Sequence, residues 1–234
     1  MKKAILFGAS GFIGSHLLDE LLSNPDYDQV TAVVRRALPS DAHVSSAKLR
    51  TLIGDFRTLP NLRADLVADE VFIALGTTKK QSPKREDYYR VDHDYPVLAA
   101  KIAKENGAKS VFIVTAVGAD PDSILPYIKT KGETERDIKA LDFQHTHIFQ
   151  PSMIVGNRKE KRAMEKTLIK AWLMVDPLFV GVLDRFKGID GKDVATAMMN
   201  AAKNQTDKVK VHQWREMSAC PMVGSPLSSP KPSR

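Results

Sequence analysis

The regular alternation of short apolar runs with helical patterns constrains the fold of this chain more than any other feature. Apolar runs typical of strands lie at residues 3–7, 30–34, 50–53, 71–75, 110–115 and 145–150, and a last short one at 209–214. Helical patterns lie at residues 12–23, 85–105, 124–140, 160–174 and 192–203. This alternation is typical of a parallel sheet covered on both faces, and right-handed crossovers leave few topologies open. We therefore expect an α/β fold built on a doubly wound parallel sheet.

A glycine-rich turn joins the first predicted strand to the first predicted helix. The stretch "GASGFIG" places Gly8, Gly11 and Gly14 three residues apart. The first glycine permits a tight turn, the second lets a pyrophosphate approach the backbone, and the third lets the helix pack on the strand. The helix N-terminus then presents free N–H groups to the phosphates. An ordinary glycine-rich turn is the alternative, but the position between strand and helix favours a dinucleotide site and a Rossmann-like sheet.

The end of the second predicted strand indicates which dinucleotide is bound. Sites that prefer NAD usually carry an Asp or Glu there, which holds the ribose 2′-hydroxyl. This chain has "VVRR" instead, with Arg35 and Arg36 at the place of the acid. A guanidinium suits a 2′-phosphate because it can form a bidentate, charge-assisted contact. We therefore expect NADP(H) to be preferred and NAD(H) to be possible; the alternative is that the arginines only face water.

Tyr127 and Lys131 lie four residues apart in "LPYIKTKGE". On a helix this spacing puts a phenol and an ammonium on one face, one turn apart. A free phenol has a pKa of about 10 and is a poor base near neutrality. A neighbouring ammonium lowers that pKa, as would the positive charge of an oxidised nicotinamide. The pair alone could be chance, so its role depends on the rest of the chain.

The glycine spacing, the Tyr–Lys pair and a hydroxyl at the end of the fifth predicted strand together resemble the short-chain dehydrogenase/reductase superfamily. The similarity is greater to its atypical group, which includes the Tat-interacting oxidoreductase-like proteins and their bacterial relatives. It covers roughly residues 1–215 and rests on "ILFGASGFIGSHLLDELL", "FIALGTT", "YRVDHDYP", "KENGAKSVFIVTAVGAD", "YIKTKGETERDI" and "FQPSMIVGNRKE". The resemblance implies an NADP(H)-dependent oxidoreductase that transfers a hydride between nicotinamide and a small carbonyl or alcohol.

The resemblance also implies a role for each matching residue. Tyr127 would be the general acid/base, Lys131 its activator and a ribose ligand, and Thr115 the hydroxyl that polarises the substrate carbonyl. The cofactor-binding residues that it implies are Gly8, Ala9, Ser10, Gly11, Phe12, Ile13, Gly14, Arg35, Arg36, Asp55, Leu75, Gly76, Thr77, Lys131, Pro151 and Ser152.

Four residues depart from the pattern of the resembled proteins. Thr115 and Ala116 stand where a Ser-Ser pair is usual, so the hydroxyl is kept with an added methyl group. Asp92 stands where many relatives outside the atypical group carry an asparagine, which leaves any proton relay open. Gln150 replaces an arginine often found before the Pro-Ser pair, and substrate preference is expected to shift with it.

Length and composition fit one domain. The 234 residues are 43% hydrophobic and 27% charged, which is ordinary for a globular chain able to bury a core. We expect residues 1–215 to form one NAD(P)-binding domain, in which about 151–215 form a small portion that covers the substrate side. From residue 216 the chain is rich in Ser and Pro without periodicity, so 216–234 are predicted to be a disordered tail.

Charge and cysteine content restrict the partners and the compartment. The net charge of +7 comes from basic residues that alternate with acids, which favours a solvated surface, or affinity for phosphate-bearing small molecules, over a nucleic-acid site. The single Cys220 fits a reducing compartment, and no secretory signal is visible. The apolar stretch 171–183 is too short to span a bilayer. We expect a cytoplasmic protein, without a membrane or nucleic-acid partner, as a monomer or homodimer.

Two other functions and one other site remain as alternatives. A non-catalytic dinucleotide-binding regulatory protein is favoured by the altered Thr115-Ala116 pair. A sugar-nucleotide epimerase would use the same tyrosine, but it usually needs a larger C-terminal domain. His145 and His147 alternate on the sixth predicted strand with no third ligand in evidence, so packing or exposure is favoured over metal binding, and we expect no metal site.

Overall fold

A seven-stranded parallel sheet organises the protein. The computed structural model describes residues 1–38, 46–78, 81–155 and 181–219. The sheet strands are, in chain order, β1 (Lys2–Phe7), β2 (Tyr27–Val34), β3 (Leu49–Ile53), β4 (Glu70–Ile73), β5 (Ser110–Val114), β6 (His145–Phe149) and β9 (Val209–His212). Their spatial order is β3-β2-β1-β4-β5-β6-β9, and every adjacent pair is parallel. The expected doubly wound α/β fold is confirmed.

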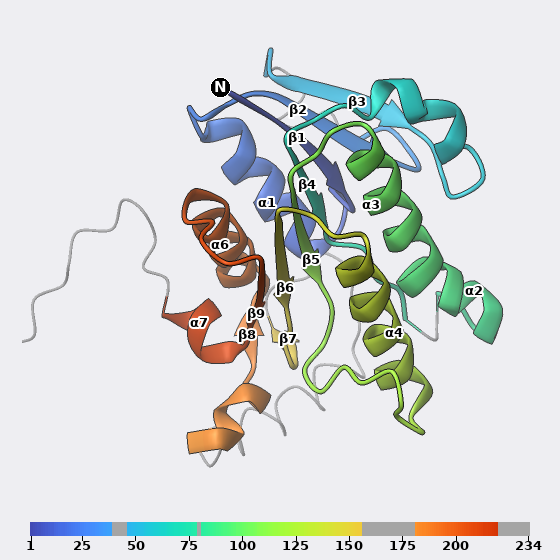
Figure 1. Cartoon of the computed structure of the whole chain (residues 1–234), viewed down its shortest axis with the longest axis vertical. Coiled ribbons are helices and arrows are strands. Elements are labelled where there is room, and N and C mark those ends of the chain that lie inside the picture. Colours follow the sequence, from blue (N-terminus) through green and yellow to red (C-terminus); the bar gives the residue numbers. More distant parts are fainter. Residues whose placement is uncertain (39–45, 79–80, 156–180, 220–234) are drawn as a thin grey trace, which may run out of the picture.

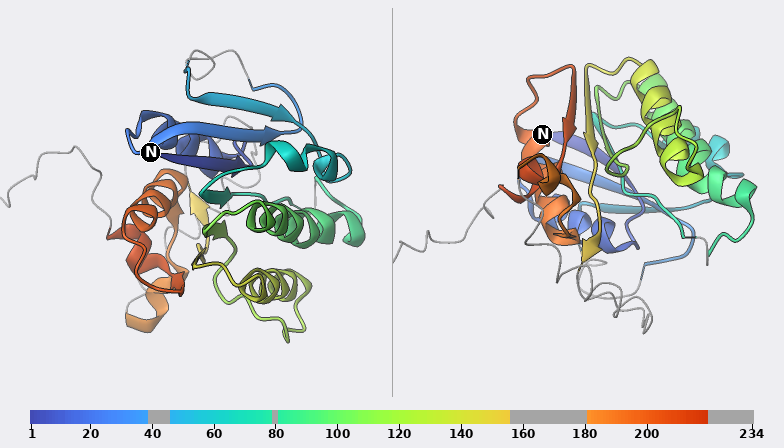
Figure 2. Two further views of the ribbon diagram at one scale, coloured as in Figure 1. Left: turned by 45° about the horizontal axis from the view of Figure 1, so that its top comes forward. Right: turned by 90° about the horizontal axis from the view of Figure 1, so that it is seen from below.

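Helices cover both faces of this sheet (Figure 1). One face carries α1 (Phe12–Ser23) and α6 (Gly191–Lys203), and the other carries α3 (Tyr95–Glu105) and α4 (Pro126–Ala140). Figure 2 shows the two helical layers on opposite sides of the sheet. The shorter elements are η1 (Leu59–Asp65), α2 (Arg85–Tyr89), η2 (Arg90–Asp94), η4 (Gly181–Phe186), α7 (Trp214–Ser218), and the strands β7 (Ile154–Val155) and β8 (Ile189–Asp190), which pair with each other.

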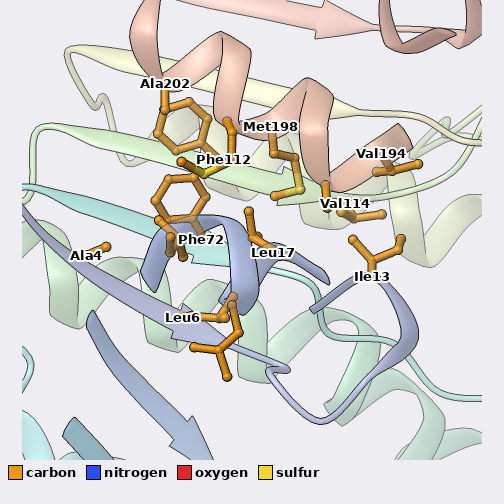
Figure 3. Packing of buried hydrophobic residues seen from close by; sticks show 14 of the residues in the cluster. Ala4, Leu6, Ile13, Leu17, Phe72, Phe112, Val114, Val194, Met198 and Ala202 are labelled. Atoms are coloured by element: carbon orange, nitrogen blue, oxygen red, sulfur yellow. The ribbon is translucent and has the colours of Figure 1, made fainter. Parts of the chain in front are cut away.

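The hydrophobic core has two halves because successive residues of a strand point to opposite faces. Leu6, Phe72 and Phe112 point toward α1 and α6, where Phe72 and Phe112 stack with ring centroids 4.6 Å apart (Figure 3). Ile5 and Ile73 belong to the half under α3 and α4. Both halves are fully buried, which explains why these strands read as continuous apolar runs.

Several elements differ from the sequence prediction. The helix expected at 85–105 is interrupted by η2, a π-helix. The strand expected at 209–214 ends at His212 and is followed by α7, which reaches Ser218. Residues 220–234 and the helix expected at 160–174 lie outside the described residues. None of the helices in the described residues is long and apolar enough to cross a membrane.

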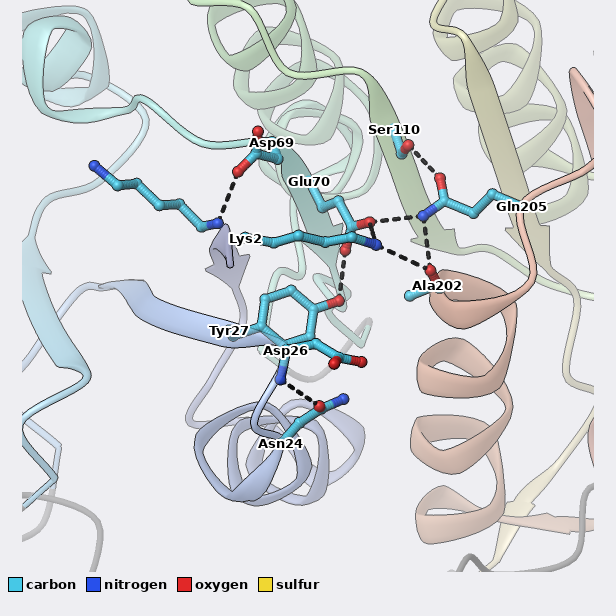
Figure 4. A network of polar contacts seen from close by, with 10 residues as sticks. Lys2, Asn24, Asp26, Tyr27, Asp69, Glu70, Ser110, Ala202 and Gln205 are labelled. Carbon is cyan, nitrogen blue, oxygen red and sulfur yellow. Dashed lines mark hydrogen bonds and ion pairs between the residues drawn. The ribbon is translucent and has the colours of Figure 1, made fainter.

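The amino-terminal edge of the sheet is closed by a polar network around Glu70 (Figure 4). The Glu70 carboxylate, which is 2% exposed, accepts hydrogen bonds from the Tyr27 hydroxyl at 2.5 Å, Lys2 Nζ at 2.7 Å and Gln205 Nε2 at 2.6 Å. Gln205 in turn accepts a hydrogen bond from Ser110. The network joins β1, β2, β4 and β5 to the chain after α6, so this edge holds the strands together.

Candidate functional site

The carboxyl ends of the strands meet at the opposite edge, where the chain order reverses between β1 and β4. Open α/β sheets bind ligands at this point. Gly8, directly after β1, has φ of +90°, and a Cβ there would lie 2.4 Å from the carbonyl oxygen of Ala74, directly after β4. Only glycine allows the two loops to approach so closely. The glycine turn predicted from the sequence therefore lies at the carboxyl ends of the strands, against the loop after β4.

The other two glycines have different reasons to lack a side chain. A Cβ at Gly14 would lie 2.0 Å from the Gly8 carbonyl oxygen, so Gly14 lets α1 pack onto the turn. Gly11 is exposed, and its Cβ would approach only the Gly8 and Ala74 carbonyl oxygens, at 3.1 and 3.9 Å. Gly11 is also the N-cap of α1, without a side-chain cap. The N-terminus of α1 thus meets an open cradle, which fits the pyrophosphate of a dinucleotide.

The rest of the turn attaches the cradle to the C-terminal part of the chain. Ala9 and Ile13 are buried in the core under α1, whereas Ser10 is exposed. The Phe12 ring packs against Gly191 at the start of α6, where a Cβ would lie 2.6 Å from it. Phe12 and Ile13 therefore have packing roles, and Ser10 is the one residue of "ASGFI" with an exposed side chain.

Arg35, Asp55 and Tyr95 lie in one neighbourhood beyond β2 and β3. Burial and the negative charge of Asp55 raise the pKa of the Tyr95 phenol to about 12, while the Arg35 charge opposes that rise. Arg35 and Arg36 are both exposed. Asp55, predicted to approach the adenine, also orders its own loop, because its Oδ1 accepts the N–H groups of Arg57 and Thr58 at 2.9 and 3.0 Å. These bonds lower the pKa of Asp55.

The loop after β4 is attached to a buried carboxylate. Leu75 is half-buried and Gly76 is exposed at the crevice. The backbone N–H of Thr77 donates to Oδ2 of Asp92 at 3.0 Å, and the Thr77 hydroxyl lies 3.1 Å from that of Ser82. Asp92 is 1% exposed and belongs to η2. The predicted cofactor loop is thus held in place by the π-helix.

Tyr127 and Lys131 lie in the first two turns of α4, as predicted. The Lys131 ammonium is buried and lies 2.5 Å from Oδ1 of Asp92, so its charge is paired within the protein. Tyr127 is 45% exposed at the start of the helix. Beside it lies a pocket of about 180 Å³ whose walls include Tyr88, Pro126 and Thr130. The exposed phenol and the buried ammonium are therefore one helical turn apart, with Asp92 between the helix and the cofactor loop.

The electrostatics of Tyr127 differ from the sequence prediction. A nearby ammonium was expected to lower the pKa of the phenol. Instead, shielding of the phenol by the surrounding chain and the negative charge of Asp92 raise its pKa to about 12. Tyr88 has a raised pKa for the same reasons, and it is also affected by Tyr127. The prediction failed because spacing along one helix does not reveal that Lys131 is already paired.

The predicted catalytic hydroxyl of Thr115 is buried beneath the site. Its Oγ1 donates to Oε1 of Glu135 on α4 at 2.6 Å, and the same oxygen accepts Nε2 of Gln150 at 2.8 Å. Thr115, Glu135 and Gln150 are 5%, 4% and 7% exposed. In this arrangement the Thr115 hydroxyl is bonded to a side chain of α4. Glu135 was missed from the sequence, although it lies eight residues after Tyr127 on the same helix face.

Pro151 and Ser152 follow β6 at the same edge of the sheet. The Pro151 carbonyl accepts the N–H of Val117 at 3.0 Å, and the Ser152 hydroxyl donates to the carbonyl of Lys187. These bonds join the loops after β5 and β6 to the C-terminal part of the chain. The residues expected near the nicotinamide amide thus lie at the crevice edge, with the Ser152 hydroxyl already bonded.

The two strand histidines have different surroundings. His147 is buried and its Nδ1 lies 3.0 Å from Nε2 of His212 on β9, a partner that the sequence reading missed. His145 bonds the carbonyl of Asp207. Within the described residues, no group of three or more His, Cys, Asp or Glu side chains is arranged to hold a metal ion.

Comparisons with known proteins show which family this chain belongs to. The chain matches the family model described as NAD(P)H-binding over residues 8–205. Protein fmp52, mitochondrial, from Aspergillus fumigatus is 33% identical over 210 residues, which are 88% of this chain and 89% of that protein. The curated relatives are named mitochondrial, so the expected cytoplasmic location is wrong. That expectation depended on the single cysteine, on the lack of a visible secretory signal and on the shortness of the apolar stretch 171–183. None of these observations specifies a compartment.

Two solved structures show the same fold. MoeE5 in complex with UDP-glucose and NAD has a TM-score of 0.66 and 21% identity, and the match covers 89% of this chain and 74% of that one. The UDP-N-acetylglucosamine 4-epimerase from Methanobrevibacter ruminantium, in complex with UDP-N-acetylmuramic acid, has a TM-score of 0.68 and 18% identity. This match covers 91% of this chain and 76% of that one. At such low identity the likeness concerns the fold alone.

Proposed function

Because the chain belongs to the NAD(P)H-binding family and is related to the fmp52 proteins, we propose that it is an NADP(H)-dependent oxidoreductase of the atypical short-chain type. One observation carries the proposal. The exposed phenol of Tyr127 lies one helical turn from Lys131, and Lys131 is linked through Asp92 to the loop after β4. A proton donor and the cofactor loop are therefore parts of one connected site at the switch point of the sheet.

The cradle at the N-terminus of α1 would hold the pyrophosphate, and the loops after β4 and β6 would line the nicotinamide half. Arg35 is the proposed partner of a 2′-phosphate, because it is exposed after β2 and its charge reaches the same neighbourhood as Asp55. Asp55 would lie near the adenine. Together these residues support a preference for NADP(H), with NAD(H) as the weaker ligand.

The chemistry proposed for this chain's residues is proton transfer to a small carbonyl. The bound nicotinamide supplies the hydride that reaches the carbonyl carbon. Tyr127 gives its phenolic proton to the carbonyl oxygen, so one O–H bond breaks and another forms, and the half-exposed phenolate then regains a proton from solvent. Lys131 would hold the cofactor ribose. For Thr115 to bind the same carbonyl oxygen, its hydroxyl must turn away from Glu135.

A non-catalytic dinucleotide-binding protein is the second candidate. Two observations favour it: the Thr115 hydroxyl is bonded to Glu135, and the Lys131 charge is paired with Asp92. Such a protein would bind NADPH and respond through its contacts with a partner. The exposed position of Tyr127 favours the enzyme, because a purely structural tyrosine would be buried and hydrogen-bonded.

The test is turnover of NADPH or NADH with a panel of ketones, aldehydes and quinones, followed by the absorbance of the reduced nicotinamide. Wild type is compared with Tyr127→Phe and with Tyr89→Phe, in which the same atom is removed from a tyrosine that bonds Glu133 instead. Turnover that is lost only in Tyr127→Phe supports the enzyme. Tight NADPH binding without turnover across the panel would refute it and favour the binding protein.

A further inference from the structure

Glu135 is a buried carboxylate that takes no part in the proposed mechanism. It lies on α4, about two turns after Tyr127, and is 4% exposed. Its Oε1 accepts the Thr115 hydroxyl at 2.6 Å and Nε2 of Gln150 at 2.8 Å, while Nζ of Lys139 lies 3.7 Å from its Oε2. Because Thr115 follows β5 and Gln150 follows β6, this one side chain bonds α4 to the ends of two neighbouring strands.

The main chain around Thr115 leaves its side chain only a rotation about χ1. The Thr115 N–H donates to the Phe149 carbonyl at 2.8 Å, and two residues later the N–H of Val117 donates to the Pro151 carbonyl at 3.0 Å. Threonine carries two heavy atoms on Cβ, so turning its hydroxyl away from Glu135 moves the methyl group or the Cβ hydrogen into that place. The Glu135 carboxylate would then lose its nearer donor in a buried environment, which is unfavourable.

A carboxylate binds a hydroxyl proton more strongly than the neutral carbonyl of a bound substrate does, because charge-assisted hydrogen bonds are roughly twice as strong as neutral ones. A hydroxyl has one proton to donate and two lone pairs that accept. The structure directs the proton of Thr115 to Glu135, with the Phe149 carbonyl as a more distant acceptor at 3.4 Å. In this arrangement Thr115 has no proton left for a substrate carbonyl.

Gln150 supports the same arrangement without replacing the Thr115 hydroxyl. It is 7% exposed, and its amide is held from both ends, because Nε2 donates to Glu135 while Oε1 accepts Nε2 of Gln213 at 3.4 Å. An amide is neutral and gives Glu135 one hydrogen bond, whereas an arginine at this position would bring a charged group with several donors. With glutamine there, the Thr115 hydroxyl at 2.6 Å is the closest donor to Glu135 among the described residues.

We propose that Glu135 is a positioning residue that commits the Thr115 hydroxyl to α4, so that this hydroxyl does not bind the substrate carbonyl. The inference rests on the proposed function and changes the role of one of its residues from a substrate ligand to a donor that holds a helix. Thr115 then serves to fix α4, which carries Tyr127 and Lys131, against the end of β5. Tyr127 is left as the group that bonds the carbonyl oxygen.

The first test reads the Thr115 side chain without substrate. Its χ1 is measured by NMR from the three-bond couplings of Cγ2 to the backbone ¹⁵N and carbonyl ¹³C nuclei, in the free protein and with NADPH or NADP⁺. We expect one rotamer throughout, the one in which the hydroxyl points to Glu135. Glu135→Met removes the acceptor at similar size and should populate more than one rotamer, whereas Glu135→Gln keeps an oxygen acceptor and should keep the wild-type rotamer. Lys139→Met, the matched control, removes the cation beside the other carboxylate oxygen and should leave χ1 unchanged.

Three results of that measurement overturn the inference. The first is a rotamer in the free protein that does not face Glu135, and the second is a change of rotamer when the nucleotide binds. The third is a single unchanged rotamer in Glu135→Met, because packing alone would then fix the side chain. If Glu135→Met does not fold, the wild-type measurements decide, since they need no variant.

The second test compares initial rates of carbonyl reduction. Thr115→Val replaces the hydroxyl by a methyl group and should lower kcat by at most about threefold, far less than the roughly 10²–10³-fold cost of losing a donor to a developing oxyanion. A loss of that larger size in Thr115→Val overturns the inference even if Tyr127→Phe is inactive as proposed. Absence of turnover in the wild type refutes only the proposed function, because the rotamer measurement tests Glu135 without any substrate.

Discussion

Two tyrosines of this protein lie near buried carboxylates, one at each edge of the sheet. At the amino-terminal edge, Tyr27 is 2% exposed and donates to Glu70. At the carboxyl edge, Tyr127 is 45% exposed and feels the charge of Asp92. Burial and the adjacent carboxylate raise the pKa of both phenols. The pKa is therefore raised for a buried tyrosine and for a half-exposed one alike. Only the exposed fraction of the side chain distinguishes a tyrosine that can meet a substrate from one that holds strands together.

The lysines at the two edges differ in the same way. Lys2 pairs with Glu70 but keeps 43% of its side chain in solvent, whereas Lys131 pairs with Asp92 at 6% exposure. Glu70 has two further donors, Tyr27 and Gln205, that share its charge (Figure 4). A buried carboxylate with several donors tolerates the loss of one. The two edges thus separate a redundant structural network from a site in which each charge has a specific partner.

The largest contrast is expected from removing one phenolic oxygen at each edge. Tyr127→Phe should lower turnover by about 10²–10⁴-fold, the usual contribution of a general acid, and leave stability unchanged. Tyr27→Phe should leave turnover per folded molecule unchanged and lower the free energy of unfolding by about 1–2 kcal/mol, because a buried hydrogen bond is lost. Initial rates and urea unfolding measure both. Loss of activity in Tyr27→Phe without unfolding would contradict the division between the edges.

For the phenols, the larger loss of stability is expected at the amino-terminal edge. Removing one ammonium at each edge should instead cost more stability at the carboxyl edge. Lys131→Met leaves the Asp92 carboxylate buried without its cation and should cost about 3–5 kcal/mol of unfolding free energy. Lys2→Met should cost less than about 1 kcal/mol, because that ammonium is half exposed and Glu70 keeps two donors. Urea denaturation gives both values. Adding Asp92→Asn to Lys131→Met should restore part of the lost unfolding free energy. If the double-mutant cycle shows no coupling between the two substitutions, the ion pair does not hold η2 to α4.

A third buried polar site, between the two edges, consists of two imidazoles, His147 and His212. His147 and His212 stack and bond each other, and burial, followed for His147 by the charge of His212, lowers the pKa of each to about 4. In the unfolded chain these imidazoles titrate near pH 6.5, so between about pH 6.5 and 4 the unfolded state binds more protons. Their contribution to stability is therefore complete above about pH 6.5 and is lost as pH falls toward 4.

Replacing both histidines by phenylalanine should remove that acid sensitivity. Phe112 and Phe149 already stack on this pair, and within the described residues His147 Nε2 has no hydrogen-bond partner, so aromatic rings without nitrogen fit the same stack. We expect the variant to gain about 5 kcal/mol relative to wild type at pH 4.5, about half of it from each imidazole, with little change at pH 8. Thermal unfolding between pH 8 and 4.5 measures this difference. If the stability of both proteins falls equally with pH, other ionisable groups cause the acid sensitivity.

The order of strands and the glycine turn could be predicted because they depend on local patterns. Buried strands of a parallel sheet read as apolar runs, and Gly8 and Gly14 lie where backbones touch. The π-helix could not be predicted, because one extra residue per turn barely alters a helical pattern. α7 had a local signal that was missed: Gln213 and Glu216 form a capping box, which ends the strand and starts a helix.

The sequence indicated which residues lie at the candidate site better than it indicated the contacts that they make. Tyr127 and Lys131 are adjacent on α4 because helical spacing dictates it. The pairing of Lys131 with Asp92, 39 positions earlier in the chain, depends on how η2 packs on α4 and has no local signature. The same holds for Thr115, whose hydroxyl could face a substrate or a neighbouring helix, and which packing directs to Glu135. The direction of the Tyr127 pKa shift followed from these contacts and was therefore predicted wrongly.

The smallest expected effect concerns the rim of the carboxyl edge, where charges are exposed. Arg35→Ala should weaken NADPH binding about tenfold and leave NADH binding unchanged, because only the former carries the phosphate that a guanidinium would pair. Fluorescence titration of each nucleotide at two salt concentrations measures it, and the difference should shrink in high salt because the contact is exposed. Arg36→Ala should have the smaller effect, since the Arg35 charge is the one that reaches Tyr95 beside Asp55. Equal losses for both nucleotides would mean that Arg35 supports the loop itself, and that the cofactor preference is set elsewhere along this edge.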